Sequence, residues 1–292
     1  MAKGRIQGLL ALLITSILWG SSFPAIKLIV MDVSEYTYTW VRNLIALVSL
    51  APYVFYTYSR GEISKYIIKG GLLAGVAYSL GLWLQSWGMK FTTASKSAFI
   101  TGLYVVFVHV YTALIMRRYS VRLALALSLS IIGLYILTVP RASFNVGDLL
   151  VLLGALAWAV QIIIVDKFCH SNPLIFTFFE TIPALTFAIS ALIRGIEIIP
   201  CRTFLLIVYL GLMCSNVAYA LQVYGQRFLS PAIAAIIFLF EPVSAAIFAY
   251  VILKEVLDTM QIIGATMIIL AMLISSIGEE SYKITNRGSF KY

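Results

Sequence analysis

The second half of the chain repeats the first, and this repetition restricts the fold more than any single motif does. The matches keep one register over long stretches, with a shift of 137 residues near the end of each half and of 139 near its start. An internal repeat of this kind indicates that the same structural unit is built twice. The matched pairs are Gln85 and Gln222, Gly88 and Gly225, Lys90 and Arg227, Phe91 and Phe228, Gly8 and Gly147, and Trp19 and Trp158.

Ten apolar runs, separated by charged or turn-forming residues, divide the chain. A helix needs about 20 apolar residues to cross a bilayer, and each run has about that length. The fourth and ninth runs follow the short segments TTASKS and LSP, which supply hydroxyl caps or a proline for a first helical turn. The sequence therefore predicts an all-α, polytopic membrane protein with transmembrane helices at 7–30, 36–58, 67–89, 97–116, 121–139, 147–166, 173–193, 203–224, 232–253 and 260–278.

The composition excludes an ordinary soluble protein. Of the 292 residues, 61% are hydrophobic and 11% are charged, whereas soluble domains are about 45–50% apolar and about 25% charged. The net charge of +9 would suggest a nucleic-acid partner in a soluble domain, but here the basic residues stand in short connections between apolar runs. We therefore expect the lipid bilayer, and no nucleic acid, as the surroundings of this chain.

The distribution of lysine and arginine predicts the orientation. Thirteen basic residues fall in connections on the side of the amino terminus and six on the opposite side, so the positive-inside rule places both termini in the cytoplasm of a plasma-membrane protein. Five helices, an odd number, make up each repeat, so the second copy enters from the opposite face. We expect two inverted five-helix repeats, at 1–140 and 141–278, and a polar cytoplasmic tail at 279–292.

Three segments resemble the drug/metabolite transporter superfamily, in particular proteins with two EamA-type repeats. They are LWGSSFPAIK at Leu18 to Lys27, Arg42 early in the second run, and Gly225 to Glu255, in which Phe240, Glu241, Pro242 and Val243 precede a helix that closes in glutamate. The resemblance covers about residues 7 to 278. It implies ten helices, alternating access and movement of small metabolites, amino acids or drugs, without indicating which.

Glu241 is the first candidate for function, because a carboxylate halfway through an apolar span is costly in hydrocarbon. Helical spacing places Ser244 and Phe248 on its face, which we expect to point into the bundle. The carboxylate could contact a solute amine, carry a proton or act as a gate. Alternatively, it is a structural group bonded to helix ends and polar neighbours. The first repeat has Tyr104 at the equivalent position.

A polar stripe runs along two equivalent spans. Tyr78, Gly81 and Gln85 follow it in the third span, and Asn216, Tyr219 and Gln222 in the eighth. Amide side chains donate and accept hydrogen bonds at once, which suits a wall that binds and releases polar solutes. The alternative is that these side chains hold helices together, at roughly 0.6 kcal/mol per bond.

Aromatic residues deep in other spans predict a cavity. Trp19, Tyr104, Trp158 and Gln161 would give it aromatic walls with a few polar points. The alternative for tryptophan and tyrosine is an interfacial belt, although Trp19 lies more than three turns into its span. His109 is expected to pack away from this wall.

Arg42 and Glu180 occupy nearly equivalent places in the second and seventh spans and have opposite charges. We expect them to lie toward opposite faces of the membrane without touching each other. Each forms either a gate contact at its own face or, more simply, a contact with helix carbonyls or a snorkelling side chain.

These features favour a secondary transporter that carries a small solute by alternating access at the repeat interface. A membrane-embedded enzyme and a channel are the alternatives, but we expect no enzyme, no metal and no cofactor, since the chain has no Walker, HExxH or GxSxG pattern. Small residues at spacing seven, Ala126 with Gly133 and Gly264 with Ala271, could pack within the chain or between subunits. Both a monomer and a homodimer thus remain open.

Overall fold

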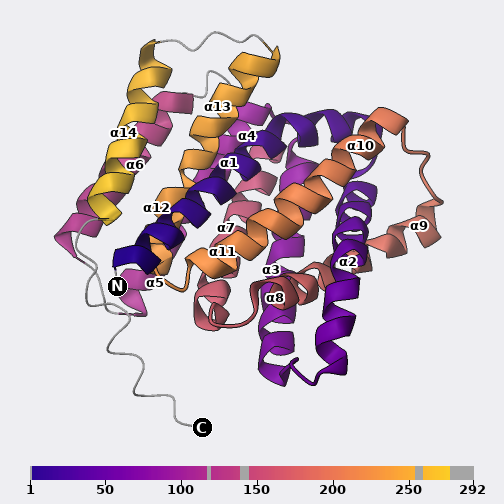
Figure 1. Ribbon diagram of the computed structural model, residues 1–292. Helices are drawn as coiled ribbons and strands as arrows, with labels where there is room; N and C mark the ends of the chain where they lie inside the picture. Colours follow the sequence, from indigo (N-terminus) through magenta and orange to yellow (C-terminus); the bar gives the residue numbers. More distant parts are fainter. Residues whose placement is uncertain (1, 117–119, 139–144, 254–258, 277–292) are drawn as a thin grey trace.

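The computed structural model describes residues 2–116, 120–138, 145–253 and 259–276, and within these every regular element is a helix (Figure 1). Expected helices and observed helices agree in place along the chain. The bounds are α1 Ala2–Asp32, α2 Glu35–Ser59, α3 Lys65–Gly88, α4 Ala94–Gly102, α5 Tyr104–Leu114, α6 Val121–Thr138, α7 Val146–Phe168, α8 Pro173–Thr181, η1 Ile182–Ala188, α9 Ile189–Arg194, α10 Cys201–Tyr209, η2 Leu210–Val217, α11 Ala218–Gly225, α12 Pro231–Phe238, α13 Phe240–Leu253 and α14 Thr259–Ser276. The expected tail at 279–292 lies outside the described residues.

Seven of these helical runs are long and apolar enough to cross a membrane. Three of the predicted spans fall short of that standard. The span at 36–58 contains many threonines and tyrosines besides Arg42, and those at 121–139 and 260–278 have shorter apolar cores, Val121–Ile136 and Ile262–Ser275. The qualifying runs are Lys3–Asp32, Lys65–Gly88, Lys96–Leu114, Val146–Phe168, Pro173–Arg194, Cys201–Gly225 and Pro231–Phe248.

Polar side chains start several helices, because the first backbone N–H groups of a helix have no internal acceptor. Thr93 accepts from the N–H of Lys96 at the start of α4, and Ser230 does the same for Ile233 at the start of α12, where Pro231 follows. The two expected caps are therefore confirmed.

Two spans that we expected to be continuous are broken in the middle. The fourth divides at Leu103 into α4 and α5, and the ninth divides at Leu239 into α12 and α13. The two breaks have the same short turn. In each, the N–H of the leucine at the break donates to the carbonyl oxygen three residues earlier, at 3.1 Å. The break in the ninth span thus begins at Leu239, three residues before Pro242. The break at Leu103 has no proline beside it. Proline alone therefore cannot explain both breaks, and packing between helices must contribute.

Two further spans depart from regular α-helix. The seventh continues from α8 into the 3₁₀ segment η1, which has Pro183 in its first turn. The eighth contains the π-helical segment η2 between α10 and α11. A π-helical turn is rare and often marks a functional site, because it turns side chains away from the regular helical register.

Glycines form two close helix crossings, one at each end of the bundle. At the first, α1 meets α11. A methyl group on Gly8 would lie 3.1 Å from the carbonyl oxygen of Gly225, and one on Gly225 would lie 3.1 Å from the carbonyl oxygen of Gly8. At the second, α3 meets α7, and Gly88 and Gly147 give 2.6 Å in both directions. The repeat pairs Gly8 with Gly147 and Gly225 with Gly88, so the two crossings are equivalent to each other.

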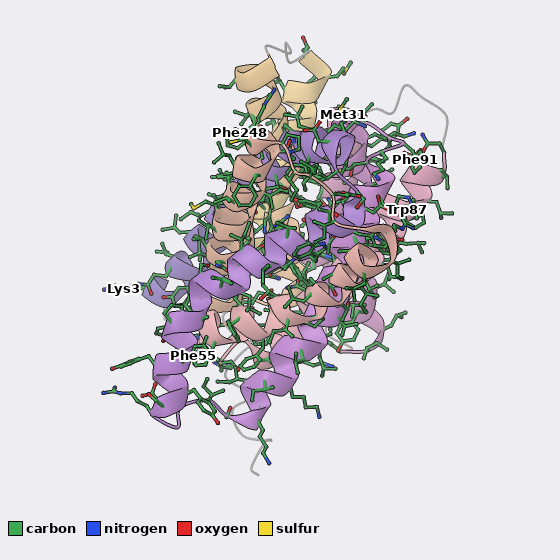
Figure 2. All side chains as sticks on the ribbon, turned by 90° about the vertical axis from the view of Figure 1, so that its right-hand side faces the viewer. Lys3, Met31, Phe55, Trp87, Phe91 and Phe248 are labelled. Atoms are coloured by element: carbon green, nitrogen blue, oxygen red, sulfur yellow. The ribbon has the colours of Figure 1, made fainter. Side chains whose placement is uncertain are left out.

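The second crossing lies at the opposite end of the molecule from the first. Lys27, near the end of α1, donates to the carbonyls of Met89 and Thr92, just beyond Gly88. In Figure 2, Met31 lies toward the upper end with Trp87 and Phe91, above Lys3 and Phe55. We name the upper end, with Lys27, Lys90 and Lys96, the lysine end, and the lower end, with Arg227, the arginine end.

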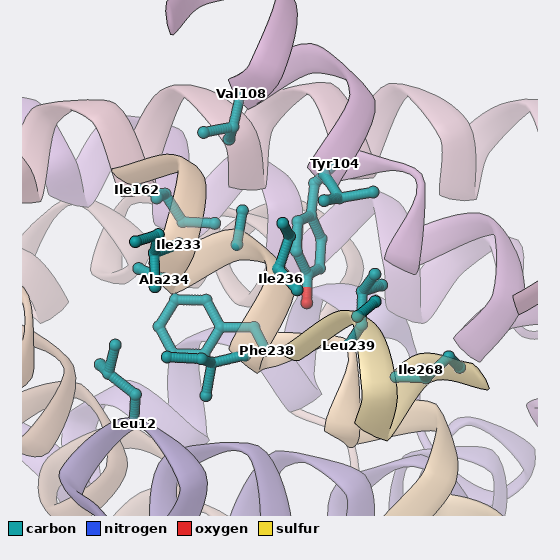
Figure 3. Close-up of a cluster of buried hydrophobic side chains, with 14 of the residues drawn as sticks. Leu12, Tyr104, Val108, Ile162, Ile233, Ala234, Ile236, Phe238, Leu239 and Ile268 are labelled. Atoms are coloured by element: carbon teal, nitrogen blue, oxygen red, sulfur yellow. The ribbon is translucent and has the colours of Figure 1, made fainter. Parts of the chain in front are cut away.

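The broken ninth span is the most deeply buried part of the core. Every residue of α12 is buried, and Figure 3 shows Tyr104 among Ile236, Phe238 and Leu239. At one edge of the molecule α6 packs along α14 (Figure 1). There a methyl group on Gly133 would lie 2.8 Å from the carbonyl oxygen of Gly264, so these small residues pack within the chain.

Candidate functional site

A cavity lies at the centre of the bundle, and both halves of the sequence line it. The first half contributes side chains from α1 to α5, and the second contributes them from α7, α11 and α13. The lining residues are Trp19, Ser22, Ile26, Arg42, Leu82, Gln85, Thr101, Tyr104, Trp158, Gln161, Ile162, Tyr219 and Glu241.

The cavity is narrow in this structure. The space between its lining atoms measures about 440 Å³ when the part open to solvent is included, but the centre of a water molecule fits within only about 30 Å³ of it. One water needs about 10–15 Å³ by that measure. The cavity therefore has room for about two waters, and a metabolite can enter only when the helices separate.

Aromatic rings form one side of the cavity. Trp19 of α1 and Trp158 of α7, which the repeat pairs, both approach Tyr219, with ring centroids at 4.9 and 6.4 Å. Tyr78 of α3 packs behind them, with its ring 4.8 Å from that of Tyr219. The Nε1 of Trp19 donates to the carbonyl of Cys214 at 3.2 Å, which fixes this ring within the bundle and excludes a role at the membrane interface.

Arg42 is buried in the same wall, and its hydrogen-bond partners are neutral. Its Nε donates to Ser215 Oγ at 2.8 Å, and its Nη1 donates to Tyr38 Oη at 2.5 Å. Ser215 lies in the π-helical segment η2, so the irregular turn places its hydroxyl against the guanidinium. Tyr78 extends this network, since its hydroxyl donates to Asn43 Oδ1 and contacts Ser215 Oγ. No carboxylate pairs with Arg42 among the described residues.

Glu241 lies in the first turn of α13, directly after the break. The break gives its carboxylate a helix amino terminus, where unpaired N–H groups favour negative charge. The side chain is 7% exposed and lines the cavity. Within the part of the chain that the structure describes, its carboxylate oxygens have no hydrogen-bond donor. Ser244, expected on the same face, is buried beside it and donates to the Ser16 carbonyl.

An amide cluster joins Glu180 to the cavity. Gln161 Nε2 donates to Glu180 Oε1 at 2.7 Å and to Gln222 Oε1 at 3.1 Å, and Gln222 Nε2 donates back to Gln161 Oε1 at 2.9 Å. Gln222 also donates to Gln226 Oε1 at 2.9 Å, and Gln226 donates to the carbonyl of Ile162. These groups come from α7, α8 and α11 and lead from the cavity toward the arginine end.

The structure brings most of the predicted site residues together. Seven line the cavity: Trp19, Arg42, Gln85, Tyr104, Trp158, Gln161 and Glu241. Tyr78, Glu180 and Gln222 lie one step behind its wall and bond or pack against lining residues. Asn216 lies further away, where its amide donates to Ser49 Oγ and the carbonyl of Ala46 and joins α2 to η2.

The equivalent amides Gln85 and Gln222 differ in their surroundings. Gln85 lines the cavity and donates to Thr101 Oγ1 at 3.1 Å, whereas Gln222 is covered by Gln161. Arg42 and Glu180 have separate partners, as expected, and His109 lies outside the cavity lining, bonded to the carbonyl of Val105.

Sequence reasoning missed Tyr38, Asn43, Ser215 and Gln226, which hold the charged and amide groups in place. The contact of Tyr38 with Arg42 could have been predicted, since the two residues stand one helical turn apart on the same face. Ser215 had none, because only the π-helical turn brings it to the guanidinium.

No group of three or more histidine, cysteine, aspartate or glutamate side chains gathers in a metal-binding arrangement in the described ranges. The three cysteines, Cys169, Cys201 and Cys214, are free thiols. The chemistry of the cavity thus comes from one guanidinium, one carboxylate, amides, hydroxyls and aromatic rings.

Comparison with known proteins gives this fold a family. The model of the EamA-like transporter family matches the chain twice, at residues 6–139 and 145–277. An "Uncharacterized transporter" of Archaeoglobus fulgidus is 28% identical over 94% of this chain and 87% of its own length. The "Uncharacterized transporter YoaV" of Bacillus subtilis is 20% identical over 90% and 94%. A crystal structure shares the fold, with a TM-score of 0.73 at 15% identity over 94% of this chain and 96% of that one. The chain belongs to the EamA-like transporter family and is a multi-pass membrane protein.

Proposed function

We propose that this protein is a secondary transporter that moves a small solute by alternating access, with the central cavity as its binding site. The main support is the charge in that cavity. Arg42 and Glu241 both line it, each is buried, and neither has an oppositely charged partner among the described residues. An uncompensated buried charge is costly, so a ligand that supplies the missing partner is stabilised there.

The solute class follows from this pair of charges. A guanidinium binds carboxylate or phosphate through several parallel hydrogen bonds, and Glu241 is suited to an ammonium group. Gln85 and Gln161 add donors and acceptors, and the rings of Trp19 and Trp158 add an apolar surface. We therefore favour a zwitterionic solute with an apolar part, such as an amino acid or another small metabolite, over a drug-like cation.

The proposed architecture is ten membrane crossings in two inverted repeats, 1–140 and 141–278. To the seven long apolar runs it adds α2, α6 and α14. The two glycine crossings support it: Gly8 at the start of α1 meets the end of α11, and Gly147 at the start of α7 meets the end of α3. Because these crossings lie at opposite ends of the bundle, the equivalent helices α1 and α7 start at opposite ends, as an inverted repeat requires.

The proposed orientation places the arginine end and both termini in the cytoplasm of the plasma membrane. Lys3, Arg60, Lys65, Lys167 and Arg227 belong to this side, which has the larger number of basic residues. Because the cavity is narrow in this structure, solute enters after the helices separate at one end. Rocking of one repeat against the other would open the two ends in turn.

The experiment that tests this function is exchange of solute in proteoliposomes. A thermal-shift screen of the purified protein against amino acids, nucleobases, sugars and cationic drugs first selects the solute, since a ligand of the native state raises its stability. Exchange of the labelled solute should saturate. Arg42→Gln and Glu241→Gln should each reduce it at least tenfold, because each removes one charge from the cavity, and Glu241→Gln does so without changing the shape of the side chain.

The control is Glu62→Gln, which removes an exposed carboxylate far from the cavity and should transport normally. Unsaturated flux at channel rates would contradict the transporter. Normal exchange by Glu241→Gln at normal abundance would contradict the site.

A further inference from the structure

Glu180 lies one step behind the cavity wall and is only partly satisfied. Its side chain is 1% exposed. Its Oε1 accepts one hydrogen bond from Gln161, while its Oε2 is buried and has no hydrogen-bond partner among the described residues. An ionised carboxylate would need several donors or a nearby cation to be stable at such a depth.

The elements packed around α8 supply no such cation. On α3 the facing titratable group is Tyr78, and on α11 it is Tyr219. The thiol of Cys214, on η2, donates to the Leu18 carbonyl of α1 instead. On α2 the cation is Arg42, which donates to Ser215 and Tyr38 instead. The segment η1 has no titratable residue. Burial without a counter-charge therefore favours a neutral, protonated Glu180 in this conformation. Glu241 differs, because it lines the cavity in the first turn of α13, where a helix amino terminus favours negative charge.

Gln161 connects that carboxyl group to the solute. Its amide faces the cavity, yet both of its N–H groups are already used, one on Glu180 and one on Gln222. A hydrogen bond to an ionised carboxylate is roughly twice as strong as one to a neutral group. An ionised Glu180 would thus hold Gln161 away from the solute, whereas a protonated Glu180 would hold it weakly enough for a solute to displace the contact.

We propose that Glu180 is the proton-binding residue of the carrier and that its proton frees Gln161 to bind solute, so that proton and solute bind together. This inference rests on the proposed transport function. The proton comes from the water that reaches the site when the helices separate. It forms the O–H bond of the carboxyl group and returns to water when the solute leaves. Nothing is oxidised or reduced.

Infrared spectroscopy of the purified protein without solute tests the proton directly. A protonated buried carboxyl group gives a carbonyl band at neutral pH that exposed carboxylates do not give. We expect Glu180→Gln to remove one carboxyl from this band, Gln161→Leu to shift it, and Glu62→Gln to leave it unchanged. An unchanged band in Glu180→Gln would overturn the proposal, whatever the transport assay shows.

Thermal stabilisation by a mixture of the twenty standard amino acids tests the coupling. We expect binding to the wild type to be about tenfold tighter in mildly acidic than in mildly alkaline buffer, a factor usual for coupled sites. Glu180→Gln should bind equally at both. A wild-type pH dependence retained in Glu180→Gln would overturn the coupling. If the mixture stabilises no variant, the solute class proposed above is wrong, and the infrared band alone decides the role of Glu180.

Glu180→Asp covers the case in which Glu180→Gln does not fold. It keeps the carboxyl group but withdraws it from Gln161 by one methylene. We expect its carbonyl band to persist at a shifted position, with a weaker pH dependence of binding. A band and a pH dependence identical to those of the wild type would show that the contact between residues 161 and 180 carries no coupling.

Discussion

The lysine end and the arginine end of the bundle have the same backbone crossing but different side-chain chemistry. Gly88 meets Gly147 at the first, and the equivalent Gly225 meets Gly8 at the second. Around the crossing at the lysine end, Lys96 pairs with the buried Asp148 at 2.6 Å, and Lys90 pairs with Glu35. Around the crossing at the arginine end, Arg227 donates to two neutral carbonyls, those of Cys169 and Ser171.

This difference shows which features a duplicated sequence preserves. The glycines are retained in both copies because backbone contact at a helix crossing leaves no room for a side chain. The charged groups around them have diverged, since several different groups can close the end of a helix bundle. The two ends should therefore require unequal free energies to open, and substitutions at equivalent positions should have unequal effects.

The largest effect is expected at Lys96. Lys96→Met leaves Asp148 fully buried and without its cation, although Thr92 and the N–H of Asn145 still donate to it. Breaking a buried ion pair by removing one partner costs about 3–5 kcal/mol. This loss is measured as the decrease in the free energy of unfolding, obtained by denaturant titration in detergent micelles.

The matched variant at the other end is Arg227→Met. It removes the donors that Arg227 supplies to the carbonyls of Cys169 and Ser171, which costs about 1–3 kcal/mol. A loss of stability in Arg227→Met as large as that in Lys96→Met would contradict the difference between the ends.

The next effect concerns the glycines themselves. A methyl group on Gly88 would lie 2.6 Å from the Gly147 carbonyl oxygen and 2.7 Å from Val151 Cγ2, so Gly88→Ala should cost about 1–3 kcal/mol through overpacking. On Gly8 the nearest atoms are 3.0 Å away at Phe228 Cβ and 3.1 Å away at the Gly225 carbonyl oxygen. Alanine favours the helix by about 0.8–1 kcal/mol over glycine, which offsets most of the strain there.

Melting temperatures of Gly88→Ala and Gly8→Ala in the same detergent separate these cases. We expect a clear decrease for the first and little change for the second. Equal decreases would show that the two crossings are equally tight, and the comparison would then rest on the charged groups alone.

Much of the fold and part of the site could be predicted from the sequence. Apolar length places each helix, the repeat pairs Gly8 with Gly147, and the cost of a buried carboxylate singles out Glu241. These signals lie in residue type and spacing. The breaks at Leu103 and Leu239 and the π-helical turn at Ser215 could not be predicted, because packing between distant helices determines them. The hydrogen bond between Gln161 and Glu180 could not be predicted either, because it depends on how α7 lies against α8.

The smallest effect is acid sensitivity of the lysine end. Glu197, in the connection between α9 and α10, accepts from the N–H of Ser34 at 2.8 Å. Burial opposes ionisation, but the hydrogen bonds from Ser34 and Thr37 and the charge of Lys90 outweigh it and hold the pKa of Glu197 below its usual 4.5. A lowered carboxyl pKa stabilises the folded state fully above the usual value, and this stability is lost as pH falls through the folded pKa.

Glu197→Gln should therefore melt below the wild type at neutral pH, and the difference should close as the pH falls below 4.5 and through the lowered pKa of the folded state. The exposed Glu62→Gln near the arginine end is the matched control and should follow the wild type at every pH. A constant difference down to acid pH would mean that Glu197 acts through its shape and not its charge. Any acid sensitivity of the lysine end would then have to come from its ion pairs, Lys96 with Asp148 and Lys90 with Glu35.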